Sequence, residues 1–211
     1  MEKVIYRNLE KQDYNRIKEL ICKAFSFDKF IEDDKLLDLL LNIYLQDCIL
    51  ASSYSQVAVN NNNKVIGIIL GSAHKDKRRI RKPHNIFSIL STGIKLIFTN
   101  KENKKGLKSF GKITDTYKEI IKGKEEDFQG CIQLFIVSEE CRGLGVGKTL
   151  VNQLFDYMKS MDVKSLYLYT DDRCNYGFYD SQNFNRINEK LVYMDAMNDK
   201  LEVYLYVYNL D

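Results

Sequence analysis

A glycine-rich turn between a strand and a helix constrains this chain more than any other feature. The apolar run 131–137 is typical of a buried strand, and the apolar residues at 150, 151, 154, 155 and 158 share one face of a helix. Between these segments lie Gly143, Gly145 and Gly147. Glycine permits positive φ angles and a close approach to the backbone, and the first N–H groups of a helix have no partners inside it. The stretch 137–149 therefore predicts an anion site, most simply for a phosphate or pyrophosphate.

Two nucleotide-binding motifs match this turn incompletely. A Walker A loop requires G-x-x-x-x-G-K-[ST], but Arg142 stands where the first glycine belongs. A dinucleotide fingerprint, G-x-G-x-x-G, has Lys148 at its third glycine position. The run 166–171 could imitate the strand that ends in a magnesium-binding Asp. A P-loop nucleotide hydrolase therefore stays open as an alternative.

Length and composition predict a folded protein of one domain, or one domain with an insertion. The chain has 211 residues, of which 45% are hydrophobic and 29% are charged. Its formal net charge is only +3, so we expect no nucleic-acid partner. The five cysteines form no CxxC pair and are predicted to be reduced thiols of a cytoplasmic protein without a metal site. No signal peptide and no membrane-spanning run is visible.

Hydrophobic periodicity predicts alternating helices and strands along the rest of the chain. Asp13 is expected to cap the first helix, and Asp33 or Asp34 should begin a second helix that is apolar on most sides. The four asparagines 60–63 predict a hairpin loop. The remaining predicted elements are strands at 4–7, 56–59, 64–70, 165–170, 188–194 and 201–208, and a short helix at 176–183.

Residues 75–124 differ from their surroundings in charge. They contain 15 Lys and Arg against 4 Asp and Glu, a net +11, which leaves −8 for the remainder of the chain. Apolar residues predict one short helix over 86–98 and a second around Phe110, Ile113, Tyr117, Ile120 and Ile121. We interpret the block as a basic helical insertion. It is either a solvated face or a lid that attracts an anionic ligand.

The spacing Arg142-x-x-Gly145-x-Gly147 resembles the acyl-CoA loop of the GNAT N-acetyltransferase superfamily, whose pattern is Gln/Arg-x-x-Gly-x-Gly/Ala. The segment 175–184 also resembles a late helix of that family, which usually carries Asn, then Phe-Tyr, then Gly-Phe. Asn183 replaces the usual glycine here. The resemblance is good over 131–195, extends over 1–73 in the order of elements only, and does not cover 75–124.

The resemblance implies a single GNAT-like acyltransferase domain over 1–211, with the insertion at about 75–124. Its fold class is α/β (α+β), with a mixed, mostly antiparallel central sheet, helices on both faces and a splayed acyl-CoA cleft. Asn175 would either contact the cofactor or cap its helix. Backbone groups would hold the pantetheine arm at Phe135, Ile136 and Val137, and the pyrophosphate at Arg142, Gly143, Leu144, Gly145, Val146, Gly147 and Lys148.

The implied reaction transfers the acetyl group of the cosubstrate acetyl-CoA to a primary amine of a small molecule or peptide, by direct attack in a ternary complex. Tyr179 stands where the family often places the acid that protonates the departing thiolate. A strand N–H near Ile136 would stabilise the thioester oxygen. The base is unassigned, because Cys131 stands where some members carry Glu and Gln133 is no proton acceptor. His74 is a candidate by position, with His84, Glu126 and Asp127 behind it and a water path as an equal alternative.

Several expectations remain open. The missing strand carboxylate allows a catalytically silent acyl-CoA-binding or regulatory module on the same fold. The acceptor carries no motif, although the basic insertion suggests an acidic one. Cys141 is interpreted as structural. The apolar second helix and the tyrosine-rich last strand, with Tyr204, Tyr206 and Tyr208, could form a homodimer contact.

Overall fold

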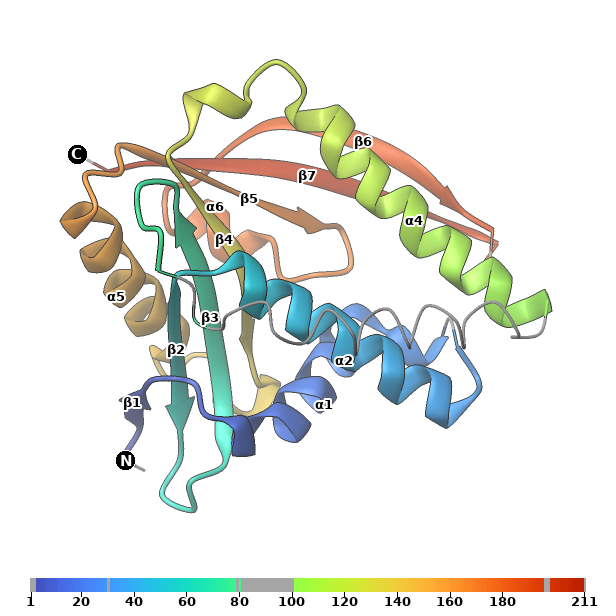
Figure 1. Cartoon of the computed structure of the whole chain (residues 1–211), viewed down its shortest axis with the longest axis horizontal. Coiled ribbons are helices and arrows are strands. Elements are labelled where there is room, and N and C mark those ends of the chain that lie inside the picture. Colours follow the sequence, from blue (N-terminus) through green and yellow to red (C-terminus); the bar gives the residue numbers. More distant parts are fainter. Residues whose placement is uncertain (1–2, 30, 79, 81–100, 196–197, 211) are drawn as a thin grey trace.

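The protein is built on one twisted sheet, seen in a computed structural model that describes residues 3–29, 31–78, 80, 101–195 and 198–210. The sheet has seven strands in the order β1-β2-β3-β4-β5-β7-β6 (Figure 1). Among the described strands, β4 and β5 form the only parallel pair. The predicted mixed, mostly antiparallel sheet is therefore confirmed. The strands are β1 (Ile5–Arg7), β2 (Tyr54–Val59), β3 (Val65–Ala73), β4 (Gly130–Val137), β5 (Ser165–Asp171), β6 (Asn185–Met194) and β7 (Asp199–Asn209).

Helices cover both faces of this sheet, as predicted. α1, α2 and α4 pack on one face, and α5 and α6 pack on the other. We call these the α2/α4 face and the α5 face. No helix within the described ranges is long and apolar enough to cross a membrane. The helices are α1 (Tyr14–Phe25), α2 (Asp34–Ala51), α4 (Lys101–Ile121), α5 (Val146–Ser160) and α6 (Gly177–Ser181).

The two helix caps predicted at the N-terminal end have different outcomes. Asp33 accepts a hydrogen bond from the N–H of Leu36 at 2.9 Å, so it caps α2 as expected. The prediction for Asp13 is wrong, because its side chain makes no cap bond to α1. Its carboxylate instead accepts two hydrogen bonds from the Arg7 guanidinium, at 2.7 and 2.8 Å, and one from the N–H of Glu10.

Alternation along the central strands separates the two cores. On β5, Leu166 and Leu168 are buried on the α5 face, whereas Tyr167 and Tyr169 pack on the α2/α4 face. On β7, Tyr204 and Tyr206 are buried on the α5 face, with exposed fractions of 3% and 0%. These two tyrosines therefore belong to the core of the chain, and the predicted dimer contact through them is wrong.

A bulge in β4 breaks this alternation at Gln133. Leu70 of β3 pairs with Leu134, whereas the next residue, Gly71, pairs with Ile132, so Gln133 is an extra residue in the ladder. Consequently Ile132 and Leu134 pack on opposite faces of the sheet although they are two residues apart. The pairing of β4 with β5 also stops at this point, since only Gly130 and Cys131 have partners on β5. The two strands separate from Ile132 onward.

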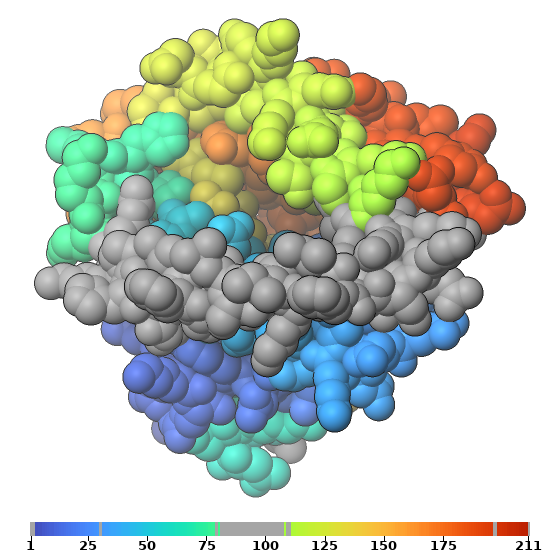
Figure 2. Space-filling model, turned by 45° about the vertical axis from the view of Figure 1, so that its right-hand side comes forward, coloured from blue at the N-terminus to red at the C-terminus, as the bar shows by residue number. Residues whose placement is uncertain are grey.

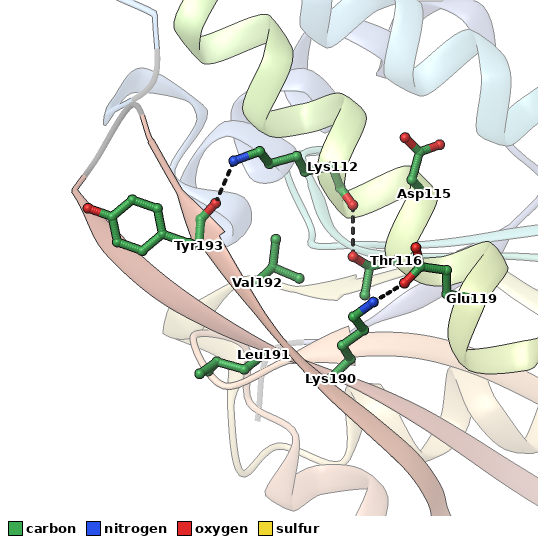
Figure 3. Close-up of a pocket in the computed structure, with 8 residues that line it drawn as sticks. All are labelled: Lys112, Asp115, Thr116, Glu119, Lys190, Leu191, Val192 and Tyr193. Carbon is green, nitrogen blue, oxygen red and sulfur yellow. Dashed lines mark hydrogen bonds and ion pairs between the residues drawn. The ribbon is translucent and has the colours of Figure 1, made fainter.

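The helix α4 confirms the second helix predicted in the basic insertion. It packs across β6 and β7, where Asn188 donates a hydrogen bond to the carbonyl of Ile120 at 2.6 Å. Figure 3 shows the groove where α4 meets β6, with Lys190 paired to Glu119 across it. Lys112 also spans the junction, with its ammonium 2.6 Å from Asp195. The first predicted helix, over 86–98, lies outside the described residues.

Candidate active site

The glycine-rich turn ends in a helix N-terminus with unsatisfied donors. Gly145 precedes α5 with a φ of 76°, and Gly143 has a φ of 78°, a left-handed conformation that glycine adopts without strain. Within the described chain, these backbone N–H groups have no hydrogen-bond partner: Gly143, Gly145, Val146, Gly147 and Lys148. Such donors at the positive end of a helix dipole form an anion site.

Two N–H groups of the predicted pyrophosphate loop are already used. The N–H of Arg142 donates to the carbonyl of Glu139 at 3.2 Å, and that of Leu144 donates to Cys141 at 3.4 Å. The Arg142 guanidinium lies 3.2 Å from a Glu139 carboxylate oxygen, and both side chains are exposed. Arg142 can therefore reach a ligand phosphate only by leaving a solvent-exposed pair, which costs less than about 1 kcal/mol.

The separated part of β4 has an unpaired backbone edge. Ser138 donates to the carbonyl of Ile66 at 2.8 Å, which places Ile136 and Leu134 in hydrogen-bonded pairs with β3. The backbone groups of Phe135 and Val137 alternate with these and point toward β5, where β4 has no partner. The edge thus offers two donors and two acceptors to an extended ligand. The N–H of Ile136 points to β3 instead, so the expectation that it serves the cleft is wrong.

Aromatic side chains connect this edge to the helix α5 and to α6. The Phe135 ring lies 5.2 Å from that of Phe178 and 6.2 Å from that of Tyr179, measured between centroids. A Cβ at Gly147 would lie 3.2 Å from the Phe178 ring and 3.3 Å from the Phe135 ring, so a side chain there would crowd both rings. The three segments named by the sequence resemblance therefore meet at one place.

Tyr179 is buried among these rings, but its hydroxyl is not sealed from solvent. Burial raises the pKa of Tyr179 well above its usual value, with smaller contributions from Cys174 and Asp171. The hydroxyl has no hydrogen-bond partner in the described chain. Among the described side-chain atoms, only Gln153 Oε1 is fully buried without a partner. The Tyr179 oxygen must therefore reach accessible space, and it is protonated at neutral pH.

Asn175 lies at the start of α6 without capping it through its side chain. Its carbonyl accepts from the N–H of Phe178 at 3.2 Å, while its exposed side chain makes no hydrogen bond in the described structure. The side-chain cap expected at this position is therefore absent, and the amide is oriented by its backbone alone.

None of the predicted bases within the described residues lies at the open part of the gap. Burial raises the pKa of the Cys131 thiol to about 12, and the Gln133 amide donates to the Ser72 hydroxyl at 3.2 Å. The N–H of His74 bonds to Gln129 before β4 begins, so His74 lies at the other end of that strand from Val137. Glu126 and Asp127 are exposed in a short turn ahead of β4, and His84 lies outside the described residues.

The sequence singles out Asp171 only as the residue that would end a magnesium-binding strand, and the acetyltransferase resemblance gives it no role. This residue ends β5, its exposed fraction is 9%, and its Oδ1 accepts from the N–H groups of Arg173 and Cys174 at 3.0 and 3.2 Å. Burial raises the pKa of the carboxyl group. Its place at the end of an apolar strand was the signal that the sequence offered, whereas its burial is a result of tertiary packing. Within the described ranges, no cluster of His, Cys, Asp or Glu is arranged to hold a metal ion.

The P-loop alternative does not fit this arrangement. Its nucleotide-hydrolase core is built on a parallel sheet, whereas the described sheet is almost wholly antiparallel. The hydroxyl of Thr149, which would have to bind magnesium, donates to the carbonyl of Gly145 at 3.1 Å.

Comparisons with known proteins agree with the geometry. The model of the acetyltransferase (GNAT) family matches residues 14–184. Similar solved structures include an agmatine N-acetyltransferase, with TM-score 0.57, 10% identity and coverage of 98% of this chain and 99% of that one. NAA60 of Arabidopsis thaliana, solved with a bisubstrate analogue, has TM-score 0.55, 14% identity and 98% coverage of both chains. An N-acetyltransferase from Staphylococcus aureus Mu50 has TM-score 0.55, 12% identity and 99% coverage of both. No curated protein matches the sequence significantly.

Proposed function

The chain belongs to the GNAT acetyltransferase family, and on that premise we propose that it is an N-acetyltransferase. It transfers the acetyl group of acetyl-CoA to a primary amine of a small molecule or peptide, by direct attack in a ternary complex. The family uses acetyl-CoA as cosubstrate. Several structurally similar proteins are N-acetyltransferases, which supports a nitrogen acceptor.

The observation that carries this proposal is the separation of β4 from β5 after Cys131. The gap exposes the unpaired backbone groups of Phe135 and Val137, whose alternation of donors and acceptors suits the two amides of a pantetheine arm. At its open end lie the five unpaired N–H groups from Gly143 to Lys148, which suit a pyrophosphate. The residues present therefore fit acetyl-CoA.

When bound, acetyl-CoA supplies an acyl thioester. The chain's own contribution is to hold that group in the gap beside the incoming amine and to exclude water through the rings of Phe135 and Phe178. Tyr179 keeps a protonated hydroxyl with no partner of its own in the described chain, which suits it to donate a proton to a departing thiolate. Asn175, just before α6, keeps an exposed amide that makes no hydrogen bond in the described structure and could contact the cosubstrate.

Two measurements test this function. Acetyl-CoA should raise the melting temperature, whereas Mg-ATP should not. Release of free thiol from acetyl-CoA should accelerate when a panel of primary amines is added. A chain that is stabilised by Mg-ATP and not by acetyl-CoA would contradict the proposal.

A catalytically silent acyl-CoA-binding module is the second candidate. It is favoured by the lack of a carboxylate on β4 at the gap, where the buried Cys131 has a raised pKa. Stabilisation by acetyl-CoA without thiol release over a wide amine panel would support this alternative instead.

A further inference from the structure

Several polar atoms with few hydrogen-bond partners lie on the α2/α4 face of the sheet, near the gap between β4 and β5. Tyr117 of α4 and Tyr169 of β5 keep accessible surface, and neither hydroxyl has a hydrogen-bond partner in the described chain. The ring of Tyr44 of α2 contacts those of Phe25 and Phe27, with centroids 5.8 and 5.6 Å away. The second carboxylate oxygen of Asp171, Oδ2, accepts from no N–H or O–H group of the described residues. None of these atoms is a fully buried orphan, so they face a space that solvent or a ligand can enter.

The surface is visibly hollowed on this side. Figure 2 shows a depression beside α4, with atoms of the β4 and β5 region at its bottom. Burial raises the pKa of Tyr117, and its side chain nevertheless keeps accessible surface. The donor-binding edge of β4 borders the same gap, so a ligand here would lie beside the reacting group.

The carboxyl group at the hollow has no cation beside it among the described residues. Asp171 makes no ion pair in the described structure, and no cation contributes to its pKa. The side chain of Arg173 turns away to Asp199 at 2.7 Å. A buried carboxylate without a cation is costly and is kept mainly where a ligand supplies the opposite charge.

Aromatic faces lie next to this carboxylate. The rings of Tyr117 and Tyr169 stack with centroids 4.3 Å apart and an angle of 7° between their planes. Asp171 and Tyr169 are two residues apart on β5, so the alternation of the strand places the carboxylate on the same face of the sheet as these rings. Asp171 also contributes to the raised pKa of Tyr117. Aromatic rings beside a carboxylate attract organic cations.

The groove between α4 and β6 in Figure 3 is a weaker candidate. Its two lysines already form ion pairs, Lys112 with Asp195 and Lys190 with Glu119. Neither ammonium group is therefore available to bind an anionic ligand without breaking an ion pair.

We propose that the acceptor enters the hollow on the α2/α4 face as an ammonium cation, held between the carboxylate of Asp171 and the rings of Tyr117 and Tyr169. This inference rests on the proposed function. One N–H bond of the ammonium breaks and its proton passes to Asp171 Oδ2, which leaves a neutral amine with a lone pair beside the donor gap. The basic insertion suggested an acidic acceptor from its net charge, but the residue that α4 contributes to the hollow is a tyrosine.

The test uses ligand binding without acetyl-CoA, so that it does not depend on turnover. Straight-chain alkylammonium ions from ethyl to octyl are titrated and followed by chemical-shift changes in the protein, with the matching alcohols as neutral controls. We expect the wild-type chain to bind the ammonium ions and to bind the alcohols at least about tenfold more weakly.

Paired variants assign the binding to Asp171. Asp171→Asn keeps an oxygen for the N–H groups of Arg173 and Cys174 and removes the charge, and it should weaken alkylammonium binding at least about tenfold. Asp172→Asn is the matched control, because Asp172 is exposed and its Oδ1 accepts only from the N–H of Glu202 at 3.2 Å. It should bind as the wild type does.

A second pair of variants tests the stacked rings of Tyr117 and Tyr169. Tyr117→Phe should retain alkylammonium binding, and Tyr117→Leu should lose several-fold of it, because only the ring is needed. Equal binding of alcohols and ammonium ions, no binding of either, or unchanged binding by Asp171→Asn would overturn the inference. Acetyl-CoA stabilisation of the same samples, measured separately, shows whether the proposed function itself has failed.

Discussion

Replacing Gly145 with alanine tests whether the turn before α5 holds the cosubstrate through its backbone. The φ of Gly145 is 76°, and a Cβ there would meet no atom within 4 Å. The substitution therefore creates backbone strain without a clash. A left-handed alanine costs roughly 1–2 kcal/mol, and the stiffer unfolded chain returns about 0.4–1 kcal/mol of this. The net loss of about 1 kcal/mol should lower the melting temperature by about 2–4 °C in a chain of this size.

Gly123 supplies a matched control for the strain. Its φ is 81°, a Cβ at this position would likewise meet no atom within 4 Å, and the residue lies in the turn after α4, away from the gap. Gly123→Ala should therefore lose the same stability. Only Gly145→Ala should rotate the N–H groups of Val146 and Gly147 away from a bound pyrophosphate.

The assay compares both variants by thermal melting and by calorimetric titration with coenzyme A. We expect similar melting temperatures in the absence of ligand, and a Kd about tenfold higher for Gly145→Ala, equivalent to about 1.4 kcal/mol. Gly123→Ala should bind coenzyme A as the wild type does. Unchanged affinity in Gly145→Ala, or an equal loss in Gly123→Ala, would refute the assignment of the pyrophosphate to this turn.

Three further outcomes follow from the geometry. Tyr179→Phe removes a hydroxyl that has no hydrogen-bond partner in the described chain, so the melting temperature should be unchanged. The kcat should fall about 100-fold or more, the usual range for loss of a proton donor. A change in stability with an unchanged kcat would indicate a structural tyrosine instead. Gly71→Ala places a Cβ 2.7 Å from Leu154 Cδ1 and 3.2 Å from the Cys131 carbonyl, so urea unfolding should show a loss of about 1–3 kcal/mol, and an unchanged midpoint would contradict that packing. Asp171→Asn should raise the melting temperature at pH 8, because the raised pKa of Asp171 means that its ionised form is disfavoured in the folded chain. This gain should shrink as the pH falls through that raised pKa and nearly vanish below the usual value of about 3.9, whereas a gain independent of pH would exclude the charge as its cause.

Local sequence patterns determined the parts of this protein that depend on neighbours along the chain. The glycine spacing at 143–147 requires a strand-to-helix turn with unpaired donors, and the structure has that turn. The cap at Asp33 and the helix at the end of the insertion were readable for the same reason, because helix starts and helix faces are encoded within a few residues. The family resemblance over 131–195 rests on such local motifs as well.

Tertiary structure alone decided how these parts meet. The extra residue at Gln133 is invisible in the sequence, because a bulge is defined by the register of the partner strand, yet it precedes the point where β4 separates from β5. Asp13 formed an ion pair with Arg7 in place of a cap, since a partner brought close by β1 competes with the backbone.

Packing also determined which side chains border the gap between β4 and β5. The sequence marks Asp171 only as the end of a strand. Packing makes it a buried carboxylate on the same face of the sheet as Tyr169, which stacks on Tyr117 from a distant helix of the insertion. Burial and the absence of a counter-ion among the described residues are properties of the whole assembly of α2, α4 and β5. The sequence by itself therefore determined the turn at which we propose that the donor is held, and only the fold determined which chemical groups surround the hollow that we propose for the acceptor.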